Sequence, residues 1–371
     1  MFARGRRYFA VLAFLMLAAP LAVGVVMPDG AASVLKEGRR PAPAPNAPEN
    51  LAQLAELPAE VDAWLKDRFG LRQVLMHAYR QLTKPVLGSG GGSVLIGRSG
   101  RMFYLGDDMV RQSAGLVMRD QKVSDAVDLV AEIDAALQHK GIRFLVAVPP
   151  NSSTIYQDEL PVWAQNRGRD TEYDLFLRDL RARGIKTIDL RPPVSAARGT
   201  GEIFYLHDTH WTFRGAIAAF NAVVEADRHP DWRIDAEAAL GAPVVRNGGD
   251  LARILGVEDQ TTERARMLAV PPAGKATNLT GGPTPDSEID TGRPGPTVLI
   301  IGDSFTESFF PPLLAQHAGR VNWMHFQHCA FDWTAIDRYR PDEVWWMPTE
   351  RALYCDPGAR PQGFAAEQAA K

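Results

Sequence analysis

A serine, a histidine and an aspartate stand in this chain at positions that suit the transfer of an acyl group. Ser304 ends a Gly-Asp-Ser turn that follows the apolar run 297–301, a pattern typical of a buried strand leading into a helix. Asp208 and His210 lie about ninety residues upstream. They are two positions apart, so an extended backbone would place both side chains on the same face. The three residues predict a serine nucleophile, a histidine base and an aspartate that orients the base.

A metal-dependent hydrolase is the rival chemistry for the same segment. His207, Asp208 and His210 are close in sequence, and His325 and His328 could add ligands. Their spacings match no common metal motif, so we expect no bound metal and no cofactor. The serine interpretation has its own requirement, because a hydroxyl is a weak nucleophile near neutral pH. The histidine must take the hydroxyl proton while the aspartate holds the imidazole in the correct tautomer.

Helices and strands alternate around these residues. Amphipathic patterns predict three helices, at 120–139, 173–183 and 212–225. Apolar runs predict further strands at 142–148, 185–190 and 203–206. This order predicts an α/β fold with a mostly parallel sheet flanked by helices. Open sheets of this kind place their chemistry at the carboxyl ends of the strands, where the serine turn would lie.

Three other segments have weaker patterns. Apolar pairs around a Gly-Arg-Ser-Gly turn predict a β-hairpin over 94–103. The Gly-, Pro- and Thr-rich stretch 271–296 shows little periodicity and is predicted to be a long surface loop. Apolar residues recur at helical spacing from Leu51 to Leu82, which places the start of the folded domain near residue 51.

The N-terminal residues predict export. Arg4, Arg6 and Arg7 precede an apolar run of roughly twenty residues, which is long enough to cross a bilayer. We therefore expect residues 1–27 to be a signal or anchor segment, with an uncleaved inner-membrane anchor favoured over a cleaved signal peptide. Residues 28–50 include a Pro/Ala-rich stretch and are expected to be an extended linker. Residues 51–371 would then form one domain in the periplasm.

Composition excludes several classes of protein. The chain has 371 residues, 46% of them hydrophobic and 23% charged, so it can bury a sizeable core. A net charge of −3 gives no support for nucleic-acid binding. The two cysteines, Cys329 and Cys355, are compatible with one disulfide in an oxidising compartment or with two buried thiols, and they are too few for a zinc cluster.

The two motifs resemble those of a known family. Asp208–Trp211 and Gly302–Ser304 are similar to the Asp-x-His-Trp and Gly-x-Ser motifs of the SGNH-like acyltransferases that O-acetylate exported polysaccharides, the alginate O-acetyltransferase (AlgJ/AlgX) group. Residues 94–104 resemble that family's glycine-centred hairpin, and 344–353 resemble its late strand ending in Pro-x-Glu-Arg. Ordinary SGNH esterases have the serine first, so the order here resembles a permuted arrangement. The resemblance covers roughly residues 62–353.

The resemblance implies an SGNH-like fold and an O-acetyltransferase. Ser304 would accept an acetyl group, and a polysaccharide hydroxyl, deprotonated by His210, would then attack the acyl-enzyme. Acetyl-CoA is not expected outside the cytoplasmic membrane. A membrane-bound O-acyltransferase is therefore implied as the partner that supplies acetyl groups at the inner membrane.

Three residues are predicted to bind substrate. The ring of Trp211 could stack on a sugar, and Arg351 belongs to the Pro-x-Glu-Arg segment that resembles the family. The chain has no clear counterpart of the esterase-type oxyanion asparagine. Asn151 is a positional candidate, and the backbone N–H of Ser304 is the alternative donor. Five other tryptophans are further candidates for the substrate groove, although most of them are expected to pack in the core: Trp163, Trp323, Trp333, Trp345 and Trp346.

Two further functions fit the same sequence. A periplasmic carbohydrate O-acetylesterase would use the same triad with water as the acceptor. A non-catalytic component of a polysaccharide export complex would leave the triad unused. No motif reports whether a sugar outcompetes water, because that depends on the shape of the substrate groove and on how it excludes water.

Overall fold

The computed structural model describes residues 45, 47–48, 57–58, 61–62, 64, 92–270, 273–281 and 285–364. The predicted signal or anchor segment lies outside these residues, as do most of the linker and of 51–91. The chain divides into two compact units, Met1–Gly92 with Arg253–Val257 and Ser93–Ala252 with Glu258–Lys371. In the first unit, the described residues 57–58, 61–62, 64 and 253–255 are helical. No helix within the described ranges is long and apolar enough to span a membrane. The predicted site lies in the second unit, described below.

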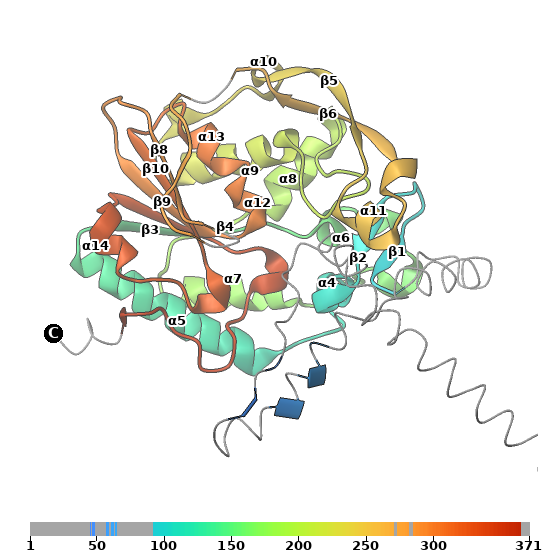
Figure 1. The fold of residues 1–371 in the computed structure, drawn as a ribbon, viewed down its shortest axis with the longest axis horizontal. Coiled ribbons are helices and arrows are strands. Elements are labelled where there is room, and N and C mark those ends of the chain that lie inside the picture. The colour runs from blue at the N-terminus through green and yellow to red at the C-terminus, as the bar shows by residue number, and fades with distance from the viewer. Residues whose placement is uncertain are drawn as a thin grey trace, which may run out of the picture. The chain divides into compact units, whose positions relative to one another are not determined.

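A seven-stranded sheet forms the centre of the second unit, with the order β4-β3-β11-β9-β10-β8-β7 (Figure 1). The first five strands in this order are parallel. Beyond them, β8 pairs antiparallel with β10, and β7 pairs antiparallel with β8. The predicted α/β fold with a mostly parallel sheet is confirmed. The strands are β3 (Arg143–Val148), β4 (Thr187–Asp189), β7 (Thr277–Asn278), β8 (Ser287–Asp290), β9 (Thr297–Gly302), β10 (Arg320–His325) and β11 (Glu343–Met347).

Helices cover both faces of this sheet (Figure 1). Side chains alternate along β9, so Val298 and Ile300 join one core while Leu299 and Ile301 join the other. The first core includes α9 (Phe213–Ala226) and α13 (Phe310–Leu314), and the second includes α5 (Asp120–His139), α7 (Glu172–Ala182) and α14 (Ala335–Tyr339). The shorter helices are α4 (Met109–Ser113), α6 (Ser152–Ile155), α8 (Arg191–Ala196), α10 (Ala236–Ala239), α11 (Asp250–Leu255) and α12 (Ser304–Glu307).

Local signals set the ends of the three long helices close to the predicted residues. Thr171 caps α7 in a capping box with Asp174, and the side chain of Thr212 caps α9 by accepting from the N–H of Gly215. Gly141 follows the end of α5 with a φ of +72°, a conformation that glycine adopts without steric cost. The three helix predictions are confirmed to within one residue at each end.

Two strand predictions and one loop prediction need correction. Residues 203–206 form no strand; Phe204 makes only an isolated bridge to Trp211, because the segment is one arm of a tight loop. The strand expected at 185–190 is shorter, Thr187–Asp189. The stretch 271–296 contains β7 and β8, which add to the sheet edge by backbone pairing and so need no apolar periodicity.

Two hairpins lie outside the central sheet. The hairpin predicted over 94–103 is confirmed as β1 (Val94–Ile96) paired antiparallel with β2 (Met102–Tyr104). A second hairpin, which no sequence motif predicts, pairs β5 (Leu240–Asn247) with β6 (Thr262–Leu268). The β5–β6 hairpin contacts α9, and the β1–β2 hairpin contacts α4 (Figure 1).

The two cysteines are joined. Cys329 follows β10 and Cys355 follows β11, and a disulfide links them across a sequence separation of 26. The sequence left a disulfide and two buried thiols equally open. The disulfide ties together the segments that leave two strands of the sheet.

Candidate active site

A tight loop presents Asp208 and His210. The N–H of Thr212 donates to the carbonyl oxygen of Ile203 over 2.9 Å, and the N–H of Tyr205 donates to the carbonyl of His210 over 3.1 Å. These bonds close a loop that leads directly into α9. Its backbone is therefore held at both ends, and the two predicted side chains lie near its tip.

Ser304 lies where the sequence predicts, at the carboxyl end of β9 and at the first residue of α12. Asp303 caps this short helix by accepting from the N–H of Phe305 over 3.0 Å. Its other carboxylate oxygen accepts from the backbone N–H of Thr349 over 2.9 Å and from the Thr349 hydroxyl. Gly302 can hold no side chain, because a Cβ there would lie 2.2 Å from Oγ1 of Thr306. The serine turn is thus fixed to the end of the neighbouring strand β11.

The structure brings the three residues into a hydrogen-bonded relay. His210 Nε2 lies 2.9 Å from Oγ of Ser304, and His210 Nδ1 lies 2.7 Å from Oδ1 of Asp208. The same Asp208 oxygen accepts from the backbone N–H of His210 over 3.0 Å. With Nδ1 protonated, Nε2 is free to accept the hydroxyl proton. Nucleophile, base and orienting acid are all within hydrogen-bonding reach, as nucleophilic catalysis requires.

Asp208 is held in its ionised form. Burial opposes its charge, but the hydrogen bonds and charge of His210, together with the charge of Arg246, outweigh burial and hold the pKa of Asp208 well below its usual range. Arg246 donates from Nη2 to Oδ2 of Asp208 over 3.1 Å. An ionised aspartate at this position can stabilise the imidazolium that forms when the serine loses its proton.

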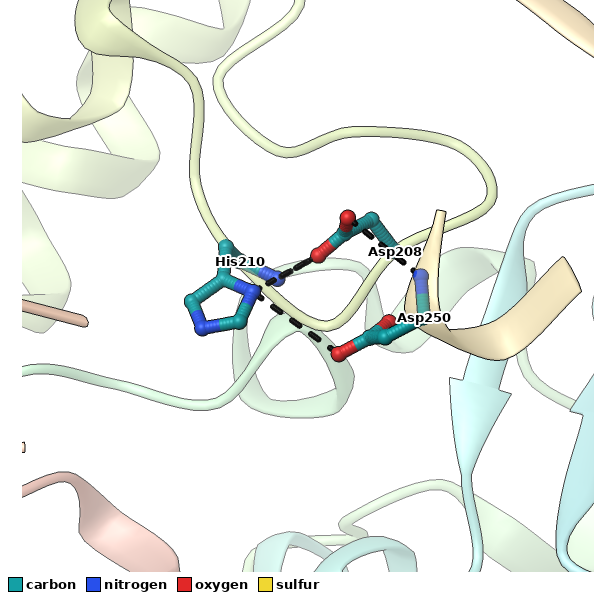
Figure 2. A group of neighbouring side chains, drawn as sticks. All are labelled: Asp208, His210 and Asp250. Atoms are coloured by element: carbon teal, nitrogen blue, oxygen red, sulfur yellow. Dashed lines mark hydrogen bonds and ion pairs between the residues drawn. The ribbon is translucent and has the colours of Figure 1, made fainter. Parts of the chain in front are cut away.

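A second carboxylate, that of Asp250, lies beside the pair (Figure 2). Its Oδ2 is 3.7 Å from His210 Nδ1, and its backbone N–H donates to Oδ2 of Asp208 over 3.4 Å. Burial raises the pKa of Asp250, and the neighbouring charge of Asp208 raises it further. No sequence motif indicates Asp250 or Arg246. The only local signal was the Gly-Gly pair before Asp250, which marks a close approach of backbones.

The predicted role of Trp211 requires correction. Its side chain is fully buried, its Nε1 donates to the carbonyl oxygen of Phe305 over 2.9 Å, and its ring stacks on that of Phe310. A ring packed in the core in this way cannot stack on a sugar at the surface. Trp211 instead ties the histidine loop to α12, which carries the serine.

Asn151 and Arg351 lie at the ends of β3 and β11. Asn151 is fully buried, and neither polar atom of its side-chain amide has a hydrogen-bond partner among the described residues. The guanidinium of Arg351 lies 5.1 Å from the ring centre of Phe305, and its Nη1 is buried without a described partner. The Phe305 ring also lies 5.0 Å from the His210 ring. Arg351 and His210 therefore contact the same aromatic side chain, that of the residue after the serine.

The remaining predicted aromatic residues mostly fill the core. Trp163 is 57% exposed, whereas four others are buried: Trp323, Trp333, Trp345 and Trp346. This agrees with the expectation that most of these rings are packing residues.

The histidines and acids of the metal hypothesis are not gathered into one group. Within the described ranges, the groups that could hold an ion are Asp208, His210 and Asp250, and separately Asp227, His229 and Glu343. His207, His325 and His328 belong to neither group. In the first group, His210 already bonds Asp208 and Ser304, and the cation of Arg246 contacts Asp208. The arrangement favours serine chemistry over metal binding.

Comparison with known proteins identifies the domain type. Residues 94–343 match the family model described as "SGNH hydrolase-like domain, acetyltransferase AlgX". The matched range includes the histidine loop and the serine turn.

Curated relatives carry related names. The chain is 25% identical over 158 residues to "Probable alginate O-acetylase AlgJ" of Pseudomonas putida, covering 43% of this chain and 40% of the relative. It is 25% identical over 155 residues to the protein of the same name from Pseudomonas aeruginosa, covering 42% and 38%. The matches thus span about two fifths of the length of these relatives.

One of two similar solved structures shows the shared fold. Bacillus cereus PatB1 with a sulfonyl adduct superposes with a TM-score of 0.53 at 12% identity, over 71% of this chain and 95% of that one. The O-acetyltransferase domain of Pseudomonas putida AlgJ gives a TM-score of 0.49 at 19% identity, over 76% of this chain and all of that one. At such identities the PatB1 superposition speaks for the fold alone.

Proposed function

Because the chain belongs to the family of SGNH hydrolase-like acetyltransferase domains of the AlgX type, we propose that it moves an acetyl group through Ser304 onto hydroxyls of an exported polysaccharide. The observation that supports this most strongly is the relay from Asp208 through His210 to Ser304, with contacts of 2.7 and 2.9 Å. The relay joins two segments that are 94 residues apart in sequence.

In the first half-reaction, His210 takes the proton of the Ser304 hydroxyl as its oxygen attacks the carbonyl carbon of the acetyl donor. Asp208 stabilises the resulting imidazolium. The tetrahedral intermediate collapses to an acetyl-serine, and His210 gives the proton to the leaving group. General-base assistance of this kind contributes about 10²–10⁴-fold to the rate.

The negative oxygen of that intermediate needs hydrogen-bond donors. We propose the backbone N–H of Ser304 as one of them. The N–H groups of Phe305, Thr306 and Glu307 all donate to Asp303, whereas that of Ser304 has no such bond among the described residues. The buried amide of Asn151 and the guanidinium of Arg351 remain candidate substrate-binding groups, since both have polar atoms that lack a described partner.

In the second half-reaction, a sugar hydroxyl is the attacking group, in the place that water would take in hydrolysis. His210 removes the proton of that hydroxyl, whose oxygen attacks the acetyl-serine, and the regenerated Ser304 hydroxyl recovers a proton from His210. The names of the curated relatives suggest alginate as the first acceptor to try. Because the chain matches only about two fifths of those relatives, the polysaccharide and the modified hydroxyl are part of the proposal.

An acceptor assay tests the transfer. The purified chain is incubated with an activated acetyl ester, with and without oligosaccharides of alginate, and acetylated sugar is separated from free acetate by mass spectrometry. We expect acetyl on the sugar and a faster loss of ester when sugar is present. Free acetate alone, at a rate that no oligosaccharide changes, would instead identify a carbohydrate O-acetylesterase that uses the same triad.

A labelling experiment tests the covalent step independently of the acceptor. A sulfonyl fluoride reacts with activated serines, and the PatB1 structure carries a sulfonyl adduct. We expect one added sulfonyl group on the peptide that contains Ser304. The same reagent should leave His210→Ala unlabelled, because the hydroxyl then lacks its base. Equal labelling of both proteins would contradict an activated serine and would favour a non-catalytic role.

We also propose that the domain works in the periplasm, next to a membrane-bound O-acyltransferase that supplies acetyl groups. The disulfide between Cys329 and Cys355 supports an oxidising compartment. The three arginines before the N-terminal apolar run would keep the N-terminus in the cytoplasm and leave the segment as an anchor. N-terminal sequencing of the cell-derived protein checks this. A mature chain starting between Asp29 and Ser33 in the soluble periplasmic fraction would refute the anchor.

A further inference from the structure

The β5–β6 hairpin and the turn after β5 lie against the Asp208–His210 pair, although the sequence there carries no catalytic motif. Arg246 lies near the end of β5, and Asp250 begins α11 four residues later. These two residues carry opposite charges and contact the pair at different atoms. The mechanism proposed above uses neither of them.

Arg246 contacts the outer oxygen of Asp208. Its Nη2 donates to Oδ2 over 3.1 Å, while its guanidinium carbon lies 3.9 Å from the ring centre of Tyr205. Its Nη1 is buried and lies 3.9 Å from Oε1 of Glu263, too far for a hydrogen bond. The guanidinium thus lies over the Tyr205 ring, and among the described residues its side-chain hydrogen bond is made to Asp208.

Asp250 holds the loop from the other side. Its Oδ1 accepts from the N–H of Thr209 over 2.8 Å and its Oδ2 accepts from the Thr209 hydroxyl. The same Oδ2 is 3.7 Å from Nδ1 of His210. Gly249 permits this approach, because a Cβ there would lie 2.4 Å from the carbonyl oxygen of His207 and 2.5 Å from Cβ of Asp208.

We propose that Arg246 and Asp250 are positioning residues that hold the Asp208–His210 pair between opposite charges, so that the imidazole keeps its bond to Asp208 and its proton affinity is set from both sides. The cation of Arg246 disfavours a second positive charge on the imidazole. The carboxylate of Asp250 favours that charge. Part of the activity test below rests on the proposed acetyl transfer, but the titration does not.

Other charged groups surround the same imidazole. Asp208 lies on the same loop as His210. Burial raises the pKa of Glu307 on α12, and the charge of His210 opposes that rise. Arg351, which follows β11, lies against the same Phe305 ring that neighbours His210. These groups are left unchanged in the experiment, so a difference between variants reports on the substituted residue alone.

The experiment follows the imidazole of His210 by NMR as the pH is changed, in the full-length chain with labelled histidine. The signal is assigned by its loss in His210→Gln. We expect Arg246→Gln to move the titration midpoint to higher pH and Asp250→Asn to move it to lower pH, each by on the order of one pH unit. The double variant should have a titration midpoint close to that of the unsubstituted protein. Arg246→Lys keeps the charge, so its midpoint should also stay close to that of the unsubstituted protein.

Matched controls remove the same charges elsewhere. Arg264→Gln removes an exposed arginine from β6 of the same hairpin, and Asp259→Asn removes an exposed aspartate from the 3-10 helix Glu258–Gln260 that precedes β6. Neither should move the titration. Midpoints that stay unchanged in Asp250→Asn and Arg246→Gln, or that move in the same direction, would overturn the proposal. Asp250→Asn preserves the shape of the side chain, so it decides the sign even where Arg246→Gln does not fold.

Turnover of an activated acetyl ester gives the second readout. The rate depends on neutral His210, so the acid side of the pH–rate profile should move with the titration midpoint in each variant. A chain that shows the shifted titrations but no turnover would contradict the proposed acetyl transfer and leave the positioning roles standing. Profiles that do not follow the shifted titrations would overturn the assignment of His210 as the base that these residues serve.

Discussion

At the scale of single residues, one hydroxyl reacts and its neighbours control a proton. Ser304 is half-buried at the first residue of a short helix, and His210 lies within 2.9 Å of it. Asp208 accepts two hydrogen bonds from His210 on the same oxygen, which fixes both the loop backbone and the imidazole. The geometry therefore assigns the imidazole proton to Nδ1 and the basic lone pair to Nε2.

Replacing the nucleophile should remove activity without unfolding the domain. Ser304→Ala deletes a hydroxyl on a half-buried turn and leaves little cavity, so its melting temperature should stay close to that of the unsubstituted protein. Turnover of an activated acetyl ester should fall by roughly 10³-fold or more. Calorimetry and steady-state kinetics measure the two quantities. A variant that kept half its rate would show that Ser304 is not the nucleophile.

The two neighbouring histidines provide a matched pair. His210→Ala should lose about as much activity as Ser304→Ala, since the members of a triad act as a unit, and Asp208→Asn should be damaging but less so. His207→Ala should retain most of the activity, because His207 has no bond to Ser304 and lies beside Glu263 instead. Equal losses in both histidine variants, with recovery on adding a metal ion, would favour the metal hypothesis.

At the scale of elements, the carboxyl ends of β3, β9 and β11 are joined by two adjacent residues. Thr349 bonds Asp303 at the serine turn. The buried carboxyl of Glu350 accepts from the N–H of Asn151 over 2.8 Å and from the hydroxyl of Thr154 over 2.6 Å. The Pro-x-Glu-Arg segment thus holds the edge of the sheet where the site lies.

The carboxyl of Glu350 should make stability depend on pH. Burial raises its pKa to about 7, despite the hydrogen bonds from Thr154 and Asn151, from an ordinary value of 4.5. Between these pH values the folded protein keeps a proton that the unfolded chain releases. The free energy of unfolding contributed by this group is therefore fully present below pH 4.5 and is lost as the pH rises through 7.

Glu350→Gln removes that dependence, because an amide does not ionise in this range. Urea unfolding at several pH values measures it. Between pH 5 and 8, we expect the unsubstituted protein to lose on the order of 2 kcal/mol more than the variant. Parallel stability curves for the two proteins would show that Glu350 is not protonated in the folded state near neutral pH.

At the scale of the whole molecule, two hydrophobic cores pack on opposite faces of the sheet whose strand β9 leads into the serine turn. The strands bury alternate side chains on both faces, so the strand that leads into the serine turn is packed on both sides. The disulfide adds a covalent link between the segments that follow the carboxyl ends of β10 and β11.

Loss of the disulfide should lower stability more than activity. Replacing both Cys329 and Cys355 by alanine leaves no unpaired thiol, and closing a loop of this length is expected to contribute about 3 kcal/mol. Thermal unfolding with and without reductant measures the effect. Reductant should lower the melting temperature of the natural chain and leave that of the double variant unchanged. A natural chain that is insensitive to reductant and carries two free thiols would contradict the bond.

The sequence by itself determined the elements whose signals are local. The ends of two helices followed from Thr212 and Gly141, and the apolar run 297–301 followed by Gly-Asp-Ser predicted a strand that ends in a serine turn. These signals act within a few residues and need no distant partner. Residue types and spacing were likewise enough to propose the Ser304, His210 and Asp208 set.

Only the tertiary structure decided what depends on distant contacts. A tryptophan can serve in a core or on a sugar-binding surface, so the residue type alone does not decide the role of Trp211. Only the packing of Phe305 and Phe310 against its ring shows that it is buried. Arg246 and Asp250 lack a motif because their role depends on where a hairpin is placed, and β7 and β8 pair through backbone groups that every residue has. Long-range pairing of this kind leaves no local periodicity, so it appears only once the chain has folded.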